Sequence, residues 1–245
     1  MTKPFLIIQL RPEDSTADNE FEAILKYGEL ASDQVIRIRA EQNGLPEINL
    51  SDLSGIIIGG SPFDVTTPEK DKKTIQIKLE QQFNDLFDRI LQIDFPFLGC
   101  CSGNGLLGNY LQTPMSRRFA ESVCCRAVTI TPEGKKDPLL KGFPEKINVF
   151  LGHKEACDEL PYNTKLLVEG EQCPVQMFRV KSNIYATQFH PEGDPDGFAL
   201  RIKVYQHHGY FKPNEAEQLI ANLQGEDTSH AHEILNRFVK RYRSA

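Results

Sequence analysis

Short apolar runs alternate with longer segments of helical periodicity through the first half of the chain. Consecutive apolar residues predict buried strands at 5–9, 35–38, 56–58 and 95–98. Apolar residues three and four positions apart predict helices at 21–28, about 68–91 and 102–111. Strands that alternate with helices indicate an α/β fold, in which a mostly parallel sheet carries helices on both faces.

Beyond residue 120 the pattern changes to a series of short β-rich segments. Turn residues separate predicted strands at 123–130, 147–151, 165–168, 175–180 and 184–189. Such spacing is typical of antiparallel hairpins, which here would extend or flank the parallel core. From about residue 197 the pattern is helical again, and it ends in an amphipathic helix at 230–242 that we expect to pack against the rest of the protein.

The sequence contains no internal repeat, low-complexity tract or linker. Its 245 residues suit one large α/β domain. We therefore predict a single domain over 1–245, with a helical C-terminal extension at about 197–245. Apolar residues make up 40% and charged residues 25% of the chain, which is ordinary for a globular protein.

Charge and hydropathy exclude several classes of partner. The 28 basic and 34 acidic residues leave a net charge of -6, which gives no overall attraction to nucleic acid or to an anionic membrane. No apolar run approaches the roughly 18 residues that a membrane-spanning helix needs. The N-terminus, MTKPFLIIQLRPED, is basic and then apolar, but the apolar run is too short for a signal peptide. We therefore expect a cytoplasmic protein.

The six cysteines do not indicate a disulfide framework in a chain of this length. The adjacent pairs Cys100-Cys101 and Cys124-Cys125 suit neither a structural disulfide nor the ligand spacing of a zinc site. We expect no metal site, and we expect most of the cysteines to be small buried apolar residues. The surroundings of Cys101 set it apart.

Cys101 lies between a predicted strand and a predicted helix. Gly99 and Gly103 flank it two residues away on each side. A nucleophile on such a strand–turn–helix elbow needs these glycines because the turn brings the flanking residues too close together for a Cβ atom. The nucleophile projects at the carboxyl end of the sheet, and the helix N-terminus favours a thiolate. Cys100 should point the opposite way, into the core.

A cysteine nucleophile needs a general base and a group that orients this base. His190 follows the last predicted strand, and Glu192 follows after a rigid proline, so both side chains project on the same side. Taken alone, His-Pro-Glu also fits a solvated surface turn. Together with the elbow, it predicts a catalytic triad of Cys101, His190 and Glu192.

Further segments accompany the triad in order along the chain. Gly55-Ile-Ile-Ile-Gly-Gly-Ser-Pro62 ends a predicted strand, Pro96-Phe-Leu-Gly99 leads into the elbow, and His153 precedes Gln188-Phe-His-Pro-Glu192. These motifs, spread over roughly residues 45–195, resemble those of the class I glutamine amidotransferases. The resemblance is greatest to the stand-alone branch that is similar to the glutaminase domain of GMP synthase.

The resemblance implies a flavodoxin-like fold and a thiol-dependent hydrolysis of a side-chain amide. His190 would take the proton of Cys101, and the thiolate would form a γ-glutamyl thioester with glutamine or a γ-glutamyl compound, releasing ammonia or an amine. Backbone N–H groups of Ser102 and of Gly60, with Gly59 as the alternative to Gly60, would hold the oxyanion. No metal and no organic cofactor is implied.

The resemblance also places Gly105, His153 and Gln188 near the substrate. Gly105 departs from the family pattern, because members that use free glutamine usually carry a glutamine there, which holds the amino-acid end of the substrate. The extra room predicts a γ-glutamyl substrate larger than glutamine. The sequence shows no synthetase domain or phosphate-binding loop to consume ammonia. Either a separate ammonia-accepting synthase exists or the protein is simply a hydrolase.

Two other interpretations are open. The adjacent thiols and the missing glutamine also fit a non-catalytic or redox-sensing binding protein on the same scaffold, although the presence of Cys, His and Glu together argues against it. The elbow also fits an intracellular cysteine peptidase, which would cleave α-peptide bonds without regard to a γ-glutamyl group.

Overall fold

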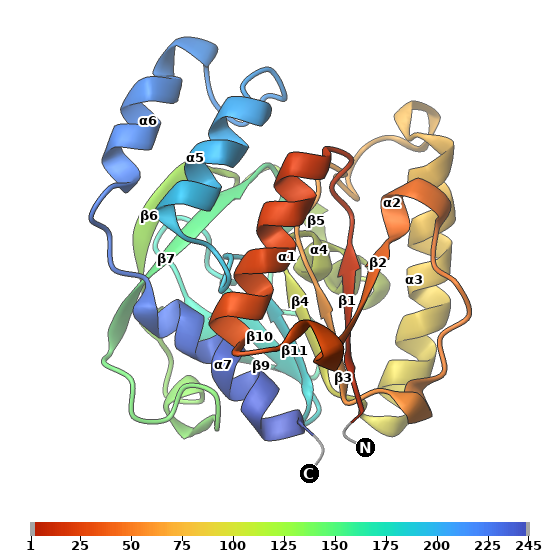
Figure 1. The fold of residues 1–245 in the computed structure, drawn as a ribbon. Helices are drawn as coiled ribbons and strands as arrows, with labels where there is room; N and C mark the ends of the chain where they lie inside the picture. The colour runs from red at the N-terminus through yellow and green to blue at the C-terminus, as the bar shows by residue number, and fades with distance from the viewer. Residues whose placement is uncertain (1–2, 244–245) are drawn as a thin grey trace.

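A nine-stranded sheet forms the centre of the computed structural model, which describes residues 3–243 (Figure 1). The strand order is β2-β1-β3-β4-β11-β10-β9-β6-β7. The parallel half of the sheet contains β1 (Phe5–Gln9), β2 (Val35–Arg39), β3 (Gly55–Ile58), β4 (Phe97–Cys100) and β11 (Ile184–Thr187). All of these except β2 are buried along their whole length, as their continuous apolar runs require.

The other half of the sheet is antiparallel. It contains β6 (Glu121–Ile130), β7 (Lys146–His153), β9 (Thr164–Glu169) and β10 (Met177–Val180). A separate two-stranded sheet pairs β5 with β8, and these strands are Met115–Ser116 and Ala156–Cys157. The predicted antiparallel extension is confirmed. The last predicted strand, at 184–189, was expected to belong to this extension alone. β11 pairs antiparallel with β10 and parallel with β4, so it also belongs to the parallel core.

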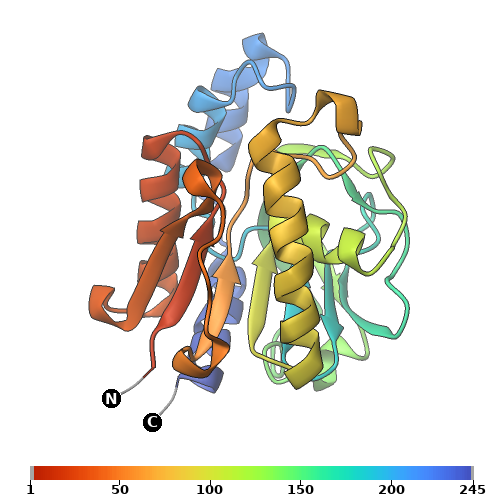
Figure 2. The same ribbon diagram turned by 90° about the vertical axis from the view of Figure 1, so that its right-hand side faces the viewer.

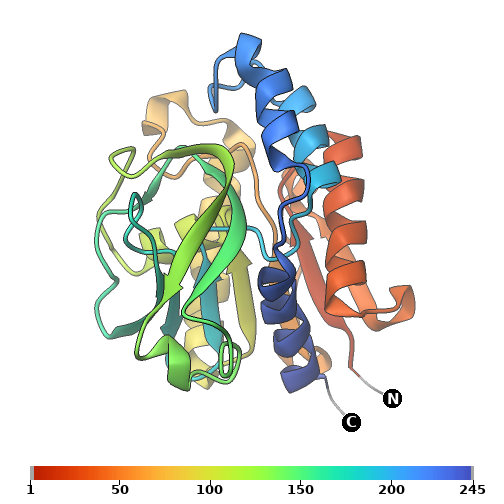
Figure 3. The ribbon, with the colours of Figure 1, turned by 90° about the vertical axis from the view of Figure 1, so that its left-hand side faces the viewer.

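Helices cover both faces of the sheet, as predicted. On one face lie α1 (Asp14–Gly28) and α7 (Ser229–Tyr242), which pack side by side (Figure 3). On the other face lie α3 (Thr74–Ile93) and α4 (Ser102–Tyr110) (Figure 2). The short α2 (Ala40–Asn43) follows β2. None of the helices within residues 3–243 is long and apolar enough to cross a membrane.

The chain is helical after the last strand, as predicted. α5 (Pro195–Val204) begins at a proline in the first turn, and the side chain of Asp194 caps it by accepting the N–H of Gly197 at 2.8 Å. α6 (Ala216–Leu223) packs against α5 and against β6. The amphipathic helix predicted at 230–242 is α7, and its apolar face is buried on the sheet.

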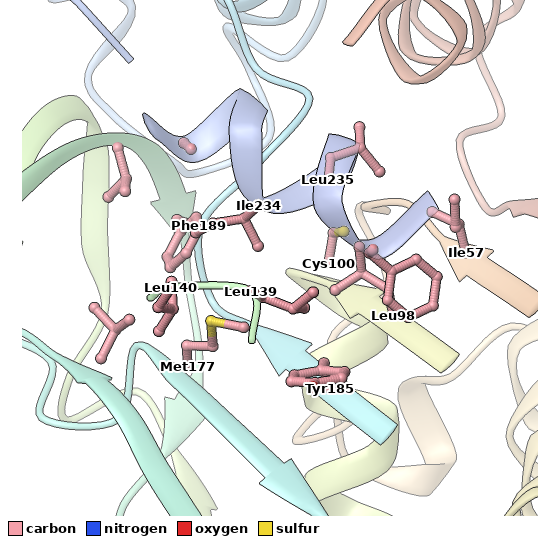
Figure 4. Close-up of a cluster of buried hydrophobic side chains, with 14 of the residues drawn as sticks. Ile57, Leu98, Cys100, Leu139, Leu140, Met177, Tyr185, Phe189, Ile234 and Leu235 are labelled. Carbon is pink, nitrogen blue, oxygen red and sulfur yellow. The ribbon is translucent and has the colours of Figure 1, made fainter. Parts of the chain in front are cut away.

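Alternation along the strands divides the core into two layers. Ile57 and Leu98 face α1 and α7, whereas their neighbours Ile58 and Phe97 face α3 and α4. Cys100 lies in the first layer and is 2% exposed (Figure 4), which confirms the prediction that it is a core residue.

Two helices begin at other residues than predicted. The polar segment 14–20, which lies before the helix predicted at 21–28, forms the first turns of α1, and its side chains include the fully buried Glu20. The long helix α3 begins at Thr74 instead of about residue 68, because Pro68 leads into a separate 3-10 turn at Glu69–Asp71. Periodicity of apolar residues could not locate either start, since polar residues form both segments.

Candidate active site

Cys101 occupies the turn between β4 and α4 in a strained conformation. Its φ of 53° and ψ of -95° lie where residues with a Cβ are rarely found. A Cβ on Gly99 would lie 2.7 Å from the carbonyl carbon of Gly103, and a Cβ on Gly103 would lie 3.2 Å from the Cβ of Ile58. This crowding confirms the reason for the two glycines that the sequence predicted.

The neighbouring strand fixes the elbow. The N–H of Cys101 donates to the carbonyl of Thr187, the last residue of β11, at 2.7 Å. The N–H of Gly105 donates to the carbonyl of Cys101 at 3.0 Å, which starts the bonding of α4. The first N–H groups of a helix have no partner within the helix, so Ser102 and the positive end of the helix dipole lie beside the nucleophile.

His190 lies just beyond β11, and the adjacent strands β4 and β11 bring it to the same edge of the sheet as Cys101. Its N–H donates to the carbonyl of Phe150 at 2.9 Å, and its ring packs edge-on against Phe198 with 5.4 Å between ring centroids. The Nδ1 atom of His190 is 2.7 Å from Oε1 of Glu192. Since Cys101 and His190 line one pocket, the structure brings the predicted nucleophile, base and orienting group together.

Arg201 completes this arrangement, and the sequence analysis missed it. It lies on α5, and its Nη2 donates to the same Oε1 of Glu192 at 3.1 Å. Its side chain is 6% exposed and that of Glu192 is 1% exposed, so this ion pair is buried. The only signal in the sequence was a basic residue on the helix that follows the His-Pro-Glu motif.

Burial keeps the resting thiol and imidazole uncharged. It raises the pKa of the Cys101 thiol to about 12, although the positive charge of Arg11 opposes this change. It also lowers the pKa of His190, despite the attraction of Glu192. At Glu192 burial is outweighed by the interaction with His190, which includes a hydrogen bond, and by the charge of Arg201, so the pKa of this carboxyl lies well below its usual range. Attack by Cys101 therefore requires that its proton move to His190.

The loop after β3 differs from the predicted oxyanion site. The N–H of Gly59 donates to the backbone of β1 at 3.2 Å, and the N–H of Gly60 donates to a buried carboxylate of α1 at 3.1 Å. The N–H of Ser61 donates instead to the Oγ of Ser102 at 2.7 Å, next to Cys101. The sequence does not single out Ser61, because the glycine pair before it matches the expected motif.

The carboxylate that accepts the N–H of Gly60 belongs to Glu20, whose side chain is fully buried. Arg11 pairs with it at 2.6 Å between Nε and Oε2, and Arg11 lines the same pocket as Cys101. Position 60 has no room for a side chain, because a Cβ would lie 2.5 Å from Nη2 of Arg11 and 2.8 Å from Cε1 of His190. The loop, the base and this ion pair are therefore packed as one unit.

Two pockets share Cys101. The first, which we call the His190 pocket, contains His190, Arg11, Arg201 and the rings of Tyr205 and Tyr210 in its lining. The second, which we call the Glu155 pocket, contains the residues Gly105, His153, Gln188, Asp64 and Glu155 in its lining. The structure thus places the three predicted substrate-contacting residues together, and it adds two acidic residues to them.

The extra room expected at Gly105 is partly filled. A Cβ at this position would lie 3.3 Å from Oε1 of Glu155. The carboxylate of Glu155 accepts the N–H groups of Val65 and Thr66 at 2.8 and 2.9 Å, which fixes it there. The room beside Gly105 is therefore smaller than the sequence alone indicates, because a side chain distant in the sequence occupies part of it.

His153 is held by a buried hydrogen-bond network. Its Nδ1 lies 3.0 Å from the carbonyl of Glu155, and its Nε2 lies 3.1 Å from a carboxylate oxygen of Glu121. Together with Cys173, His153 and Glu121 bring their ligand atoms within 4.8 Å of one another, a spacing that a metal ion could use. The Nε2 of Gln176 donates to the same oxygen of Glu121 at 2.8 Å, so two hydrogen-bond partners already contact this carboxylate oxygen.

The family model described as "Glutamine amidotransferase class-I" matches residues 14–202. The chain belongs to this family. The matched region of this class I glutamine amidotransferase begins with α1 and extends to α5, so it includes Cys101, His190, Glu192 and Arg201.

Curated relatives share a part of the chain. A glutamine-hydrolyzing GMP synthase subunit from Pyrococcus abyssi is 28% identical over 149 residues, which are 60% of this chain and 71% of that protein. The glutamine-hydrolyzing GMP synthase of Thermosipho africanus is 28% identical over 195 residues, which are 73% of this chain. The match spans 34% of the Thermosipho protein, about one third of its length.

Solved structures share the fold. A glutamine amidotransferase from Thermotoga maritima has a TM-score of 0.75 at 18% identity, and 97% of this chain and 99% of that chain are covered. A glutamine amidotransferase from Methylobacillus flagellatus has a TM-score of 0.76 at 16% identity, with 100% and 98% covered. The predicted α/β fold of the class I amidotransferases is thereby confirmed.

Proposed function

We propose that this class I amidotransferase hydrolyses the side-chain amide of glutamine or of a γ-glutamyl compound through a γ-glutamyl thioester on Cys101. The observation that carries the proposal is the strained elbow at Cys101, which shares a pocket with a His190 ring held by Glu192. Strain of this kind persists only where the surrounding structure enforces it, and it is concentrated at functional sites.

In the first half of the reaction, Nε2 of His190 accepts the thiol proton as Sγ of Cys101 attacks the γ-carbonyl carbon. The negative charge that forms on the carbonyl oxygen is held by the N–H group of Ser102 and by that of Ser61, which exchanges its hydrogen bond to Oγ of Ser102 for one to the oxyanion. Each such donor contributes about 3 kcal/mol of transition-state stabilisation. The C–N bond then breaks, His190 returns the proton to the departing nitrogen, and ammonia or an amine leaves.

In the second half, water attacks the thioester with His190 as the base. The C–S bond breaks, the thiol regains its proton, and glutamate leaves. Glu192 holds Nδ1 of His190 throughout and stabilises the imidazolium that forms twice in the cycle. No step of this sequence uses a metal or an organic cofactor.

The Glu155 pocket suits the amino-acid end of the γ-glutamyl group. Asp64 and Glu155 bring two carboxylates to its lining, and Lys154 pairs with Asp64 at 2.9 Å. A positively charged α-ammonium group would find acceptors there, and a carboxylate would find Lys154. We therefore assign substrate recognition to this pocket, which also contains Gly105, His153 and Gln188.

Where the substrate is glutamine and the product is ammonia, a separate synthase would accept the ammonia. The Pyrococcus relative is named as a subunit of GMP synthase and the Thermosipho relative as a GMP synthase, and both names support it. A simple hydrolase would need no such partner. Release of ammonia and glutamate from L-glutamine by the purified protein alone, compared with release from γ-glutamyl amides, tests the proposal. A protein that cleaves α-linked but not γ-linked substrates would contradict it and would favour the peptidase interpretation.

The acidic limb of the pH profile is expected below pH 6.5. Burial lowers the pKa of His190 from 6.5, so the ring stays neutral and able to accept a proton at lower pH than an exposed histidine. The buried Cys101 thiol, with its pKa of about 12, adds no rise in rate near pH 9. We expect kcat/KM to be flat between about pH 7 and about pH 9 and to decrease as the pH falls below 6.5. A profile that climbs through pH 8 to 9 would contradict this protonation scheme.

A further inference from the structure

The two pockets that share Cys101 differ in charge. Carboxylates of Asp64 and Glu155 line the Glu155 pocket, whereas guanidinium groups of Arg11 and Arg201 line the His190 pocket. A substrate with groups on both sides of the bond that reacts at Cys101 would extend one arm into each pocket. The chemical character of the two arms can therefore be inferred from the lining.

The position of the base identifies the pocket of the leaving group. His190 must protonate the nitrogen that departs from the γ-carbonyl carbon, so this nitrogen and its substituent lie on the side of His190. The γ-glutamyl arm is then left with the Glu155 pocket. This assignment rests on the function proposed above.

Aromatic rings line the His190 pocket beside the base, among them Phe198, Tyr205 and Tyr210. The hydroxyl of Tyr210 donates to the carbonyl of Ser61 at 3.4 Å. These rings can pack against the carbon atoms of a leaving group.

The second property of this pocket is the presence of two buried arginines in its lining. Arg11 and Arg201 are 4% and 6% exposed, and each pairs with one carboxylate, Glu20 and Glu192 respectively. The Nε and Nη1 atoms of Arg201 are buried and have no hydrogen-bond partner within the described part of the chain. Both guanidinium groups belong to the lining of the pocket. A guanidinium group in the wall of a pocket favours an anionic partner, most of all a carboxylate, whose two oxygens match the guanidinium edge.

We infer that the His190 pocket binds a leaving group that carries a carboxylate. The substrates are then γ-glutamyl amino acids or γ-glutamyl peptides. Cleavage breaks the γ-amide bond, gives the nitrogen of the released amino acid the proton from His190, and leaves the γ-glutamyl group on Cys101 for hydrolysis by water. Free glutamine fills only the Glu155 pocket and reacts without the contribution of the arginines.

The test compares two substrates that differ only in this carboxylate, γ-glutamylglycine and γ-glutamylglycinamide. We expect the wild-type protein to prefer the acid by about 10-fold to about 100-fold in kcat/KM, the range for a hydrogen-bonded charge pair. The Arg11→Gln variant should lose most of this preference. Intrinsic differences between the two leaving groups cancel, because the ratio of the two rates is compared between proteins.

Arg179→Gln provides a matched control. Arg179 lies on β10, pairs with the buried carboxylate of Asp137, and takes no part in the lining of either pocket. The control should keep the wild-type preference. If Arg11→Gln does not fold, product inhibition of the wild-type protein decides the question, since glycine should inhibit more strongly than glycinamide.

The failures of the two proposals are distinguishable. Equal kcat/KM for the acid and the amide in the wild-type protein, or an unchanged preference in Arg11→Gln, would overturn the carboxylate pocket and leave the thiol chemistry intact. Turnover of neither dipeptide nor L-glutamine would overturn both proposals together.

Discussion

Replacing Cys101 by alanine is expected to lower kcat for every γ-glutamyl substrate by at least about 10⁴-fold. The strained elbow positions a single nucleophile, and without its sulfur no thioester can form. The remaining groups, including the N–H groups of Ser61 and Ser102, would give only weak catalysis of direct attack by water. Release of glutamate, followed at saturating substrate, measures the loss.

Cys100→Ala is the matched control, because the same change is made one residue away. Cys100 lies in the core layer with Ile57 and Leu98, and it does not line either pocket (Figure 4). We expect kcat within a factor of about 3, with a loss of unfolding free energy of about 1 kcal/mol from the small cavity. Full activity of Cys101→Ala would exclude the thioester and favour a binding or sensing role for the scaffold.

The strands and the elbow could be predicted from the sequence because their signals are local. A run such as Ile56 to Ile58 is buried on both faces, and its three consecutive apolar residues are enough to predict a buried strand. The same holds for Gly99 and Gly103, because their spacing around Cys101 indicates a turn too tight for a Cβ atom at either position. The proximity of Cys101 and His190 was predictable for a related reason, since adjacent strands end at one edge of the sheet.

The second layer of the site could not be predicted, because it depends on contacts between distant segments. Glu20 is one of several acidic residues in a polar segment, and only the tertiary structure shows that it pairs with Arg11 and holds the N–H of Gly60. Glu155 fills space beside Gly105 from a loop fifty positions later. A single sequence shows the composition of such segments but not which side chains meet.

The oxyanion loop shows where a motif is insufficient. Gly59 and Gly60 fit the expected pattern. However, the N–H of Gly59 donates to the backbone of β1, and the N–H of Gly60 donates to a buried carboxylate. The N–H of Ser61 is the one directed to the start of α4. A shift of one residue reverses the direction of a backbone N–H, and the sequence contains no signal strong enough to locate it.

Replacing Glu192 by glutamine is expected to lower kcat by about 10³-fold to about 10⁴-fold. Oε1 of Glu192 accepts from Nδ1 of His190 at 2.7 Å and from Nη2 of Arg201 at 3.1 Å, while Oε2 has no partner among the described residues. A glutamine can therefore keep its oxygen toward both donors and place its NH₂ group at the other position. The geometry is retained, and the negative charge that stabilises the imidazolium is lost.

The pH profile separates this electrostatic role from a structural one. Glu192 raises the pKa of His190 against the effect of burial, so its neutralisation should move the acidic limb of kcat/KM to still lower pH. A misplaced histidine would lower the rate without moving the limb in this direction. Glu41→Gln, at a buried carboxylate that pairs with Arg39 outside both pockets, should leave both kcat and the limb unchanged. A Glu192→Gln protein with nearly wild-type kcat would mean that His190 needs no anionic partner, and the base would then have to be stabilised by the backbone alone.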